Sequence, residues 1–222
     1  MHVIVTGAAG ALGRDVAALL AKAGHTVTGI DIAESLEAID GLSFGIGSVD
    51  LGNVTAVETA IEEAVDHSGP IDGLVNIAGG FAWETIADGS PDTWDRMYAM
   101  NVRTTLNVCR AALPSLTGSA SIVNVGAGAA AKAGMGMGAY AASKAGVHRL
   151  TEALAEELKD KGTRVNAILP SIIDTPANRK DMPDADFASW VTTGELGNVI
   201  RFLLSSEASG VTGALIPVPG RV

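Results

Sequence analysis

The chain has 222 residues, of which 47% are hydrophobic, 18% charged and only 4% aromatic, and its formal net charge is -10 at pH 7. This length and composition support one aliphatic core, exclude global disorder and favour a single domain over residues 1–222. The acidic balance argues against nucleic acid or an anionic membrane surface as a partner.

Short β-branched runs alternate with longer helical patterns along the chain, which is typical of strand–helix–strand units and a parallel sheet. The strands read as apolar throughout, so we expect helices on both faces of the sheet. The predicted strands are His2–Thr6, His25–Asp31, Leu42–Ile46, Ile71–Ile77, Ala120–Val125, Thr163–Leu169 and Gly213–Val218. The predicted helices are Leu12–Ala23, Val54–His67, Pro91–Leu116, Ala139–Lys161 and Glu195–Ser205, with a more irregular Ala33–Gly41. The sequence therefore predicts an α/β fold with a seven-stranded, parallel, doubly wound sheet.

Thr6–Gly13 follows the first predicted strand and opens the first predicted helix, the context that a dinucleotide-binding turn requires. Gly7 permits a sharp exit from the strand, Gly10 allows the backbone to approach a pyrophosphate, and Gly13 allows the helix to lie close to the sheet. The start of the helix then offers free N–H groups to the anion. A glycine-rich turn without a ligand is the alternative.

Asp31 ends the second predicted strand, about 20 positions after the glycine turn, where a carboxylate accepts hydrogen bonds from a ribose 2′-OH. A carboxylate there repels a 2′-phosphate, so we expect NAD(H) to be preferred over NADP(H). A solvated aspartate at a strand end is the alternative.

Tyr140 and Lys144 are four residues apart on one face of a predicted helix, so the two side chains can share a ligand. A nearby cation favours the phenolate, and we therefore expect Lys144 to lower the pKa of Tyr140 toward a value useful for proton transfer. The same spacing also arises by chance in surface pairs.

Five motifs occur in an order and spacing that resemble the short-chain dehydrogenase/reductase superfamily: Thr6–Gly13, Asn76–Gly79, Asn101, Tyr140-xxx-Lys144 and Arg164–Pro170. The resemblance implies a single-domain Rossmann fold, hydride transfer between a nicotinamide and a small-molecule substrate, and a homodimer or homotetramer.

Carried over by this resemblance, Tyr140 exchanges the proton, Lys144 holds the nicotinamide ribose and Asn101 supports a water that relays protons. For Asn76 and Asn101, a structural role through bonds to local backbone is an equal alternative. The cofactor-binding residues that the resemblance implies are Gly7, Ala9, Gly10, Ala11, Leu12, Gly13, Asp31, Ile32, Asp50, Leu51, Asn76, Ala78, Gly79, Tyr140, Lys144, Pro170, Ile173 and Thr175.

Ala127 lies where the superfamily has a serine that orients the substrate, 13 residues before Tyr140. The segments 134–140 and 174–190 resemble those of dihydropteridine reductases, which manage without this serine. The quinonoid pterin that they reduce is an electron-poor conjugated system, which needs less help from a hydroxyl than a simple ketone does.

Residues 171–193 form the least regular stretch, and we interpret it as a lid over the substrate. Its apolar residues Met182, Phe187 and Trp190 would cover a flat ring. An ordinary surface loop is the alternative.

Several features carry no chemistry. Cys109 falls in an apolar-periodic stretch and is expected to be a core thiol. The histidines have no metal-ligand spacing, so we expect no metal site. The chain opens directly into a strand-like run, which predicts a cytoplasmic protein without a membrane span.

The leading hypothesis is thus an NADH-dependent reductase of a small conjugated substrate, with a quinonoid dihydropterin as one candidate. One alternative keeps the fold and changes the substrate to another carbonyl, imine or quinone. The other is a catalytically inactive NAD-binding regulatory protein.

Overall fold

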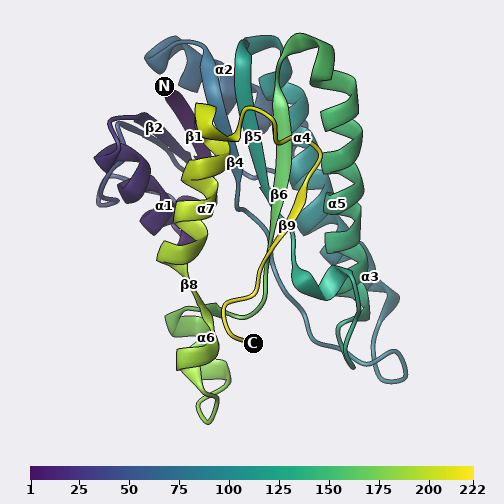
Figure 1. The fold of residues 1–222 in the computed structure, drawn as a ribbon. Coiled ribbons are helices and arrows are strands. Elements are labelled where there is room, and N and C mark those ends of the chain that lie inside the picture. The colour runs from purple at the N-terminus through teal and green to yellow at the C-terminus, as the bar shows by residue number, and fades with distance from the viewer.

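A computed structural model describes all 222 residues and contains a seven-stranded sheet in which every neighbouring pair is parallel (Figure 1). The order across the sheet is β3-β2-β1-β4-β5-β6-β9. The strands are β1 His2–Thr6, β2 Thr26–Ile30, β3 Phe44–Ile46, β4 Ile71–Asn76, β5 Leu116–Val125, β6 Arg164–Pro170 and β9 Leu215–Val218. The predicted fold class is confirmed.

The strand order reverses between β1 and β4, which pair with each other along Val3 to Thr6. In a doubly wound sheet, the chain leaves neighbouring strands toward opposite faces at such a point, and a crevice opens beyond their carboxyl ends. The glycine turn after β1 and the segment after β4 both begin at this edge, so the topology brings the predicted site residues together.

Helices cover both faces of the sheet. On one face, α1 (Ala11–Lys22) packs beside α7 (Thr193–Leu204), and the core beneath them includes Val16, Leu196 and Ile200. The other face carries α2 (Val54–Ser68), α4 (Thr104–Ala112) and α5 (Gly138–Leu158). Cys109 is wholly buried in this second core, as predicted, and burial raises its pKa to about 12.

The helix predicted over Pro91–Leu116 is divided in the structure. It comprises α3 (Pro91–Tyr98), a π-helical turn (Ala99–Arg103), α4 and a short 3-10 turn. Leu116 belongs to β5, because it pairs with Ile71 at the start of β4. The irregular helical segment predicted over Ala33–Gly41 is wrong, because these residues form bends and turns and no helix. The remaining strands and helices differ from prediction by at most a few residues at their ends, where helical periodicity and apolar runs are poor guides.

The stretch 171–193 is more regular than predicted. It contains β7 (Ile173–Asp174), α6 (Pro176–Asp181) and β8 (Val191–Thr192), and β7 pairs with β8 in a small second sheet. These elements depend on local capping and on side-chain contacts. Strands of two residues are too short to produce a periodic pattern in the sequence, so the sequence does not predict them. In Figure 1, α6 projects below the main sheet.

No helix of the structure combines the length and the apolar character needed to cross a membrane.

Candidate functional site

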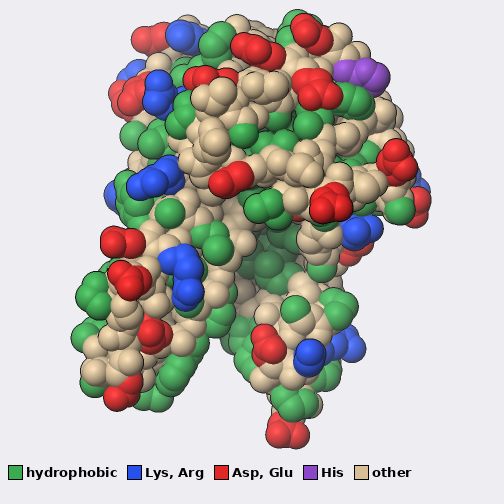
Figure 2. Space-filling view, turned by 180° about the vertical axis from the view of Figure 1, so that it is seen from behind, with side chains coloured by type: hydrophobic (Ala, Val, Ile, Leu, Met, Phe, Trp, Pro, Cys, Tyr) green, Lys and Arg blue, Asp and Glu red, His purple; other side chains and the backbone are tan.

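Two adjoining cavities lie beyond the carboxyl ends of the strands. The larger has a volume of about 1060 Å³ and runs from the glycine turn to the π-helical turn, and the smaller, of about 220 Å³, contains Tyr140 and Lys144. Both cavities share Leu12, Ile77 and Gly79. Figure 2 shows a hollow with hydrophobic side chains at its floor, between the projecting lobe that carries α6 and the rest of the molecule.

The glycine turn has the geometry that the sequence predicts. Gly7 has φ +69°, and a Cβ on Gly13 would lie 2.1 Å from the carbonyl oxygen of Gly7, so neither position accepts a side chain without a shift. Gly10 begins α1 without a capping side chain and lines the larger cavity. The first amide groups of the helix therefore face a space in which an anion can accept their hydrogen bonds.

Asp31 is fixed at the far side of this turn. One carboxylate oxygen accepts a hydrogen bond from the Ala9 N–H at 2.9 Å, and the other accepts from the Ala33 N–H at 3.0 Å. The residue is 9% exposed and lines the larger cavity together with Ile32 and Asp50. A fixed carboxylate at this point suits a ribose diol and repels a phosphate.

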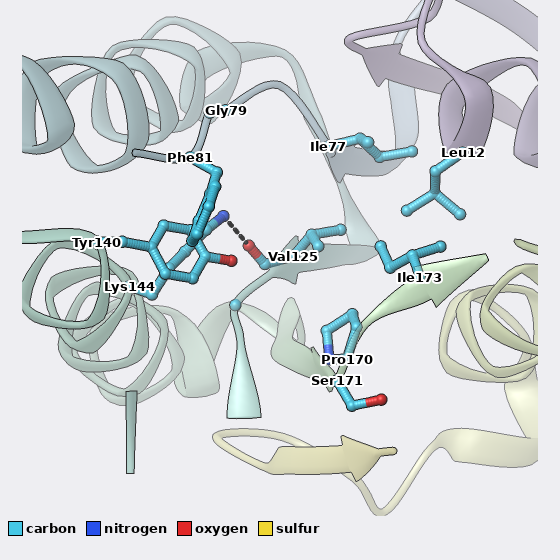
Figure 3. A pocket seen from close by; sticks show the side chains of 12 residues that line it. Leu12, Ile77, Gly79, Phe81, Val125, Tyr140, Lys144, Pro170, Ser171 and Ile173 are labelled. Carbon is cyan, nitrogen blue, oxygen red and sulfur yellow. Dashed lines mark hydrogen bonds between the residues drawn. The ribbon is translucent and has the colours of Figure 1, made fainter. Parts of the chain in front are cut away.

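Lys144 is buried in the wall of the smaller cavity, beside Tyr140. Its ammonium donates a hydrogen bond of 2.8 Å to the carbonyl oxygen of Val125, at the end of β5 (Figure 3). Burial lowers the pKa of Lys144 to about 8, because the charged form loses its hydration. A cation kept in such a place costs stability, which points to a functional reason for its presence.

Tyr140 points into the same cavity as Lys144, and both project from α5, as the spacing predicts (Figure 3). The expected effect of Lys144 on the phenol is wrong for this structure: burial raises the pKa of Tyr140 to about 12. The reason is that the phenol is buried, and burial disfavours the charged phenolate. The phenol is therefore protonated at neutral pH.

Asn101 lies in the π-helical turn and is 1% exposed. Its side-chain oxygen accepts a hydrogen bond from the Gly80 N–H, and its amide nitrogen donates to the carbonyl oxygen of Gly80 and to the hydroxyl of Ser143. This arrangement realises the structural alternative for Asn101, whereas its role toward a relaying water stays a prediction.

Ala127 is 4% exposed, has no hydroxyl and follows Gly126, which lines the smaller cavity, but Ala127 itself lines neither cavity. Its N–H donates to Nε2 of His148 at 3.4 Å, and a Cβ on the neighbouring Gly126 would lie 2.5 Å from the same Nε2. Burial lowers the pKa of His148, and the neutral ring is the form that accepts from an N–H. The imidazole of His148 thus fills the space behind the end of β5 that any side chain at position 126 would need.

The cavities gather most of the predicted cofactor-binding residues. The larger is lined by Gly7, Gly10, Ala11, Leu12, Gly13, Asp31, Ile32, Asp50, Leu51, Ala78, Gly79 and Thr175. Pro170, Ile173, Tyr140 and Lys144 line the smaller. Ala9 and Asn76 line neither: Ala9 contributes its N–H to Asp31, and Asn76 donates to Asn124 inside the sheet.

The predicted lid residues lie outside both cavities. Trp190 is only 3% exposed, and its ring packs 4.9 Å from that of Phe187, which in turn lies under the guanidinium of Arg179. Met182 is on the surface. These contacts stabilise the 171–193 segment from within, and a role over the substrate stays a prediction.

Sequence reasoning missed several lining residues, among them one aromatic residue and two arginines. Phe81 borders the smaller cavity, and Arg96 and Arg103 border the larger. Arg96 lies in α3 and Arg103 ends the π-helical turn. The two are seven residues apart, a spacing that would share one face of the continuous helix predicted from the sequence, and this is the signal that could have found them. Phe81 follows a Gly-Gly pair and has no periodic signal.

Comparison with known proteins gives three findings. The family model described as short chain dehydrogenase matches residues 1–186. A 3-oxoacyl-(acyl-carrier-protein) reductase of Thermotoga maritima is 34% identical over 98% of this chain and 95% of its own length, and a short-chain dehydrogenase/reductase of Pyricularia oryzae is 31% identical over 97% and 89%. The crystal structure of NAD+-bound xylitol dehydrogenase superposes with a TM-score of 0.91 at 26% identity, over 99% of this chain and 97% of that one.

The buried ammonium predicts a pH-dependent stability difference between the wild type and Lys144→Met. Because the pKa of Lys144 falls from 10.5 in the unfolded chain to about 8 in the folded protein, the wild type binds fewer protons when folded. Its stability therefore rises between pH 8 and pH 10.5 relative to that of the methionine variant. Denaturant unfolding at about pH 7 and about pH 9.5 measures this, and we expect the variant's advantage to shrink by about 2 kcal/mol at the higher pH.

Lys132→Met is the control, because Lys132 is exposed. Its stability difference from the wild type should be the same at both pH values. If the stability advantage of Lys144→Met over the wild type is constant or grows with pH, the burial assigned to Lys144 is contradicted.

Proposed function

The chain belongs to the short-chain dehydrogenase family and is an NAD(P)-dependent oxidoreductase, and from that premise we propose that it reduces small conjugated carbonyl, imine or quinone compounds with NADH. The observation that carries the proposal is the protonated phenol of Tyr140 beside the buried Lys144, in a cavity that lacks the usual hydroxyl at position 127. The cofactor, the proton and the choice of substrate each have their own support.

The residues present fit a nicotinamide dinucleotide. The larger cavity combines uncapped amides at the start of α1 with a fixed carboxylate at Asp31, and these groups match a pyrophosphate and a ribose diol. The smaller cavity joins it through Leu12, Ile77 and Gly79, and the nicotinamide end of the cofactor would lie toward Tyr140 and Lys144. When bound there, the cofactor supplies the hydride.

The proton comes from this chain. Tyr140 donates the proton of its phenol to the oxygen or nitrogen of the substrate as the adjoining carbon gains the hydride, and the pKa of about 12 keeps that proton in place until it is needed. Lys144 fixes the end of β5 through Val125 and lines the cavity beside Tyr140. A protonated phenol favours reduction over oxidation at neutral pH.

Ala127 shapes the choice of substrate. Without a hydroxyl at this position, no side chain there polarises a carbonyl, so the substrate must itself be electron-poor. Conjugated carbonyls, imines and quinones meet this requirement, and a quinonoid dihydropterin remains one candidate among them. Two of the proteins compared above are named for other substrates, a 3-oxoacyl-(acyl-carrier-protein) and xylitol, so the proposal covers the whole conjugated class and not one compound.

Tyr140→Phe tests the assigned chemistry. We expect NADH oxidation, followed by absorbance, in the wild type with at least one compound of a panel of conjugated carbonyls, quinones and quinonoid dihydropterin. We expect the variant to turn over that compound at least about 100-fold more slowly, because general acid catalysis is lost. The affinity for NADH, measured by its fluorescence, should stay within about threefold. Tyr98→Phe, an exposed tyrosine, is the control.

Full turnover in Tyr140→Phe would refute the role of the phenol. Tight NADH binding with no turnover of any panel member in the wild type would instead favour a cofactor-binding protein without catalysis.

Asp31→Asn tests the cofactor preference. We expect the wild type to bind NADH more tightly than NADPH, because the carboxylate fixed by Ala9 and Ala33 repels the 2′-phosphate. Removing this charge should lower the ratio of the NADPH dissociation constant to the NADH dissociation constant by about tenfold. The repulsion between two like charges within hydrogen-bonding distance is worth roughly a factor of ten in affinity. Fluorescence titration with both cofactors measures it.

Asp50→Asn is the matched variant, because it removes one carboxylate from the same cavity. An equal change in both variants would mean a general effect of charge and not a contact at Asp31. Tighter binding of NADPH by the wild type would overturn the preference.

A further inference from the structure

Phe81 presents an apolar ring at the mouth of the smaller cavity. The residue is 58% exposed, although large aromatic side chains are usually covered, and it lines the same cavity as Tyr140 and Lys144. Its ring centroid lies 4.9 Å from that of Tyr140 with the planes at 77°, an edge-on contact. Figure 3 shows the two rings side by side at one end of the cavity.

The backbone that carries Phe81 is fixed to the proton donor. The Asn101 amide holds both the N–H and the C=O of Gly80, and its third hydrogen bond reaches the Ser143 hydroxyl at 2.9 Å. That hydroxyl donates to the backbone carbonyl oxygen of Tyr140 at 2.7 Å. A buried chain of hydrogen bonds thus connects the residue before Phe81 to the backbone of Tyr140.

A second contact holds the far side of the same loop. The ring of Trp83 packs against Gly136, where a Cβ would lie 2.2 Å from the ring, and the Glu84 N–H donates to the Gly136 carbonyl oxygen at 2.8 Å. The 81–84 segment is therefore held between Asn101 and the loop that leads into α5. The exposed face of the Phe81 ring is a built feature of the site and not a loop tip.

The remaining wall of the cavity is apolar as well. Val125, Pro170 and Ile173 face Phe81 and Tyr140 across it (Figure 3). Only three of the lining side chains are polar, those of Tyr140, Lys144 and Ser171, and the Ser171 hydroxyl already donates to the carbonyl oxygen of Pro219. A substrate with several hydroxyl groups would find few partners here, whereas a flat ring would gain contact with the Phe81 face.

We propose that Phe81 determines specificity by stacking against a planar aromatic or unsaturated ring that carries the reducible group. This inference rests on the proposed function and names the class of substrate for that same site. The ring is placed against Phe81 at the mouth, and its reducible carbon and heteroatom point inward to the Tyr140 phenol.

Two diketones that differ at one substituent test the proposal. In 1-phenyl-1,2-propanedione a phenyl ring replaces one methyl group of 2,3-butanedione, and the reacting dicarbonyl is the same. With saturating NADH, we expect Phe81→Ala to raise the KM for the phenyl compound about five- to tenfold, the scale of one aromatic contact. The KM for butanedione should change less than about twofold, and Phe81→Tyr, which keeps the ring, should restore the wild-type preference.

Ile86→Ala is the matched control, because Ile86 is 84% exposed beyond the same loop and lines neither cavity. It should leave both KM values unchanged. An equal rise in KM for both diketones in Phe81→Ala, or an unchanged KM for the phenyl compound, would overturn the proposal. An equal rise in both KM values together with a change in oligomeric state, measured by light scattering, would assign Phe81 to an interface between two copies of the chain.

A binding measurement separates this inference from the proposed function. Protein saturated with NAD+ cannot reduce a diketone, so calorimetry measures the affinity for both compounds without reaction. A loss of affinity in Phe81→Ala for the phenyl compound alone supports the ring site. If the wild type with NADH then reduces neither diketone, the proposed function fails while the ring site stands. Equal affinities of wild type and Phe81→Ala for the phenyl compound would refute the ring site whatever the turnover.

Discussion

The hydrogen bond from the buried Lys144 ammonium to the Val125 carbonyl is the contact around which the candidate site is built. A cation without hydration needs a strong acceptor, and the end of β5 supplies one at 2.8 Å. This contact ties α5 to the sheet at the carboxyl edge, and it brings Tyr140, one turn before Lys144, into the smaller cavity. The lowered pKa of the ammonium and the raised pKa of the phenol have the same cause, which is burial.

Asn101 provides the second constraint. Its amide lies in a π-helical turn, which interrupts the regular helix at the point where the side chain must reach both Gly80 and Ser143. Such turns are frequently found at functional sites, because they redirect a side chain without ending the helix. Through these bonds the loop after β4 and the helix that carries Tyr140 keep a fixed relation, and the mouth of the cavity keeps its shape.

The sequence predicts the sheet and the cofactor groove well, because both depend on local patterns. The apolar runs determine the strands, and the spacing of Gly7, Gly10 and Gly13 follows from backbone geometry that only glycine allows there.

The division of the 91–116 helix could not be predicted, since the π-helical turn depends on contacts of Asn101 with residues distant in the sequence. The electrostatics also lay beyond the sequence: spacing alone predicts that Lys144 and Tyr140 share a face, but the direction of the phenol's pKa shift depends on how deeply the phenol is buried. Phe81 is placed by Gly80 and Trp83 through tertiary contacts, so no pattern marks it. Trp190 shows the converse: an aromatic residue in an irregular segment predicts a lid, and in the structure its ring is buried against Phe187, while its role over a substrate stays a prediction.

The most direct test of the central claim is a crystal structure of the protein with NAD+. We predict electron density for the nicotinamide ring in the smaller cavity, with the Lys144 ammonium and the Tyr140 hydroxyl within hydrogen-bonding distance of its ribose. A dinucleotide bound elsewhere, or a nicotinamide that lies outside this cavity with Tyr140 facing away from it, would contradict the account.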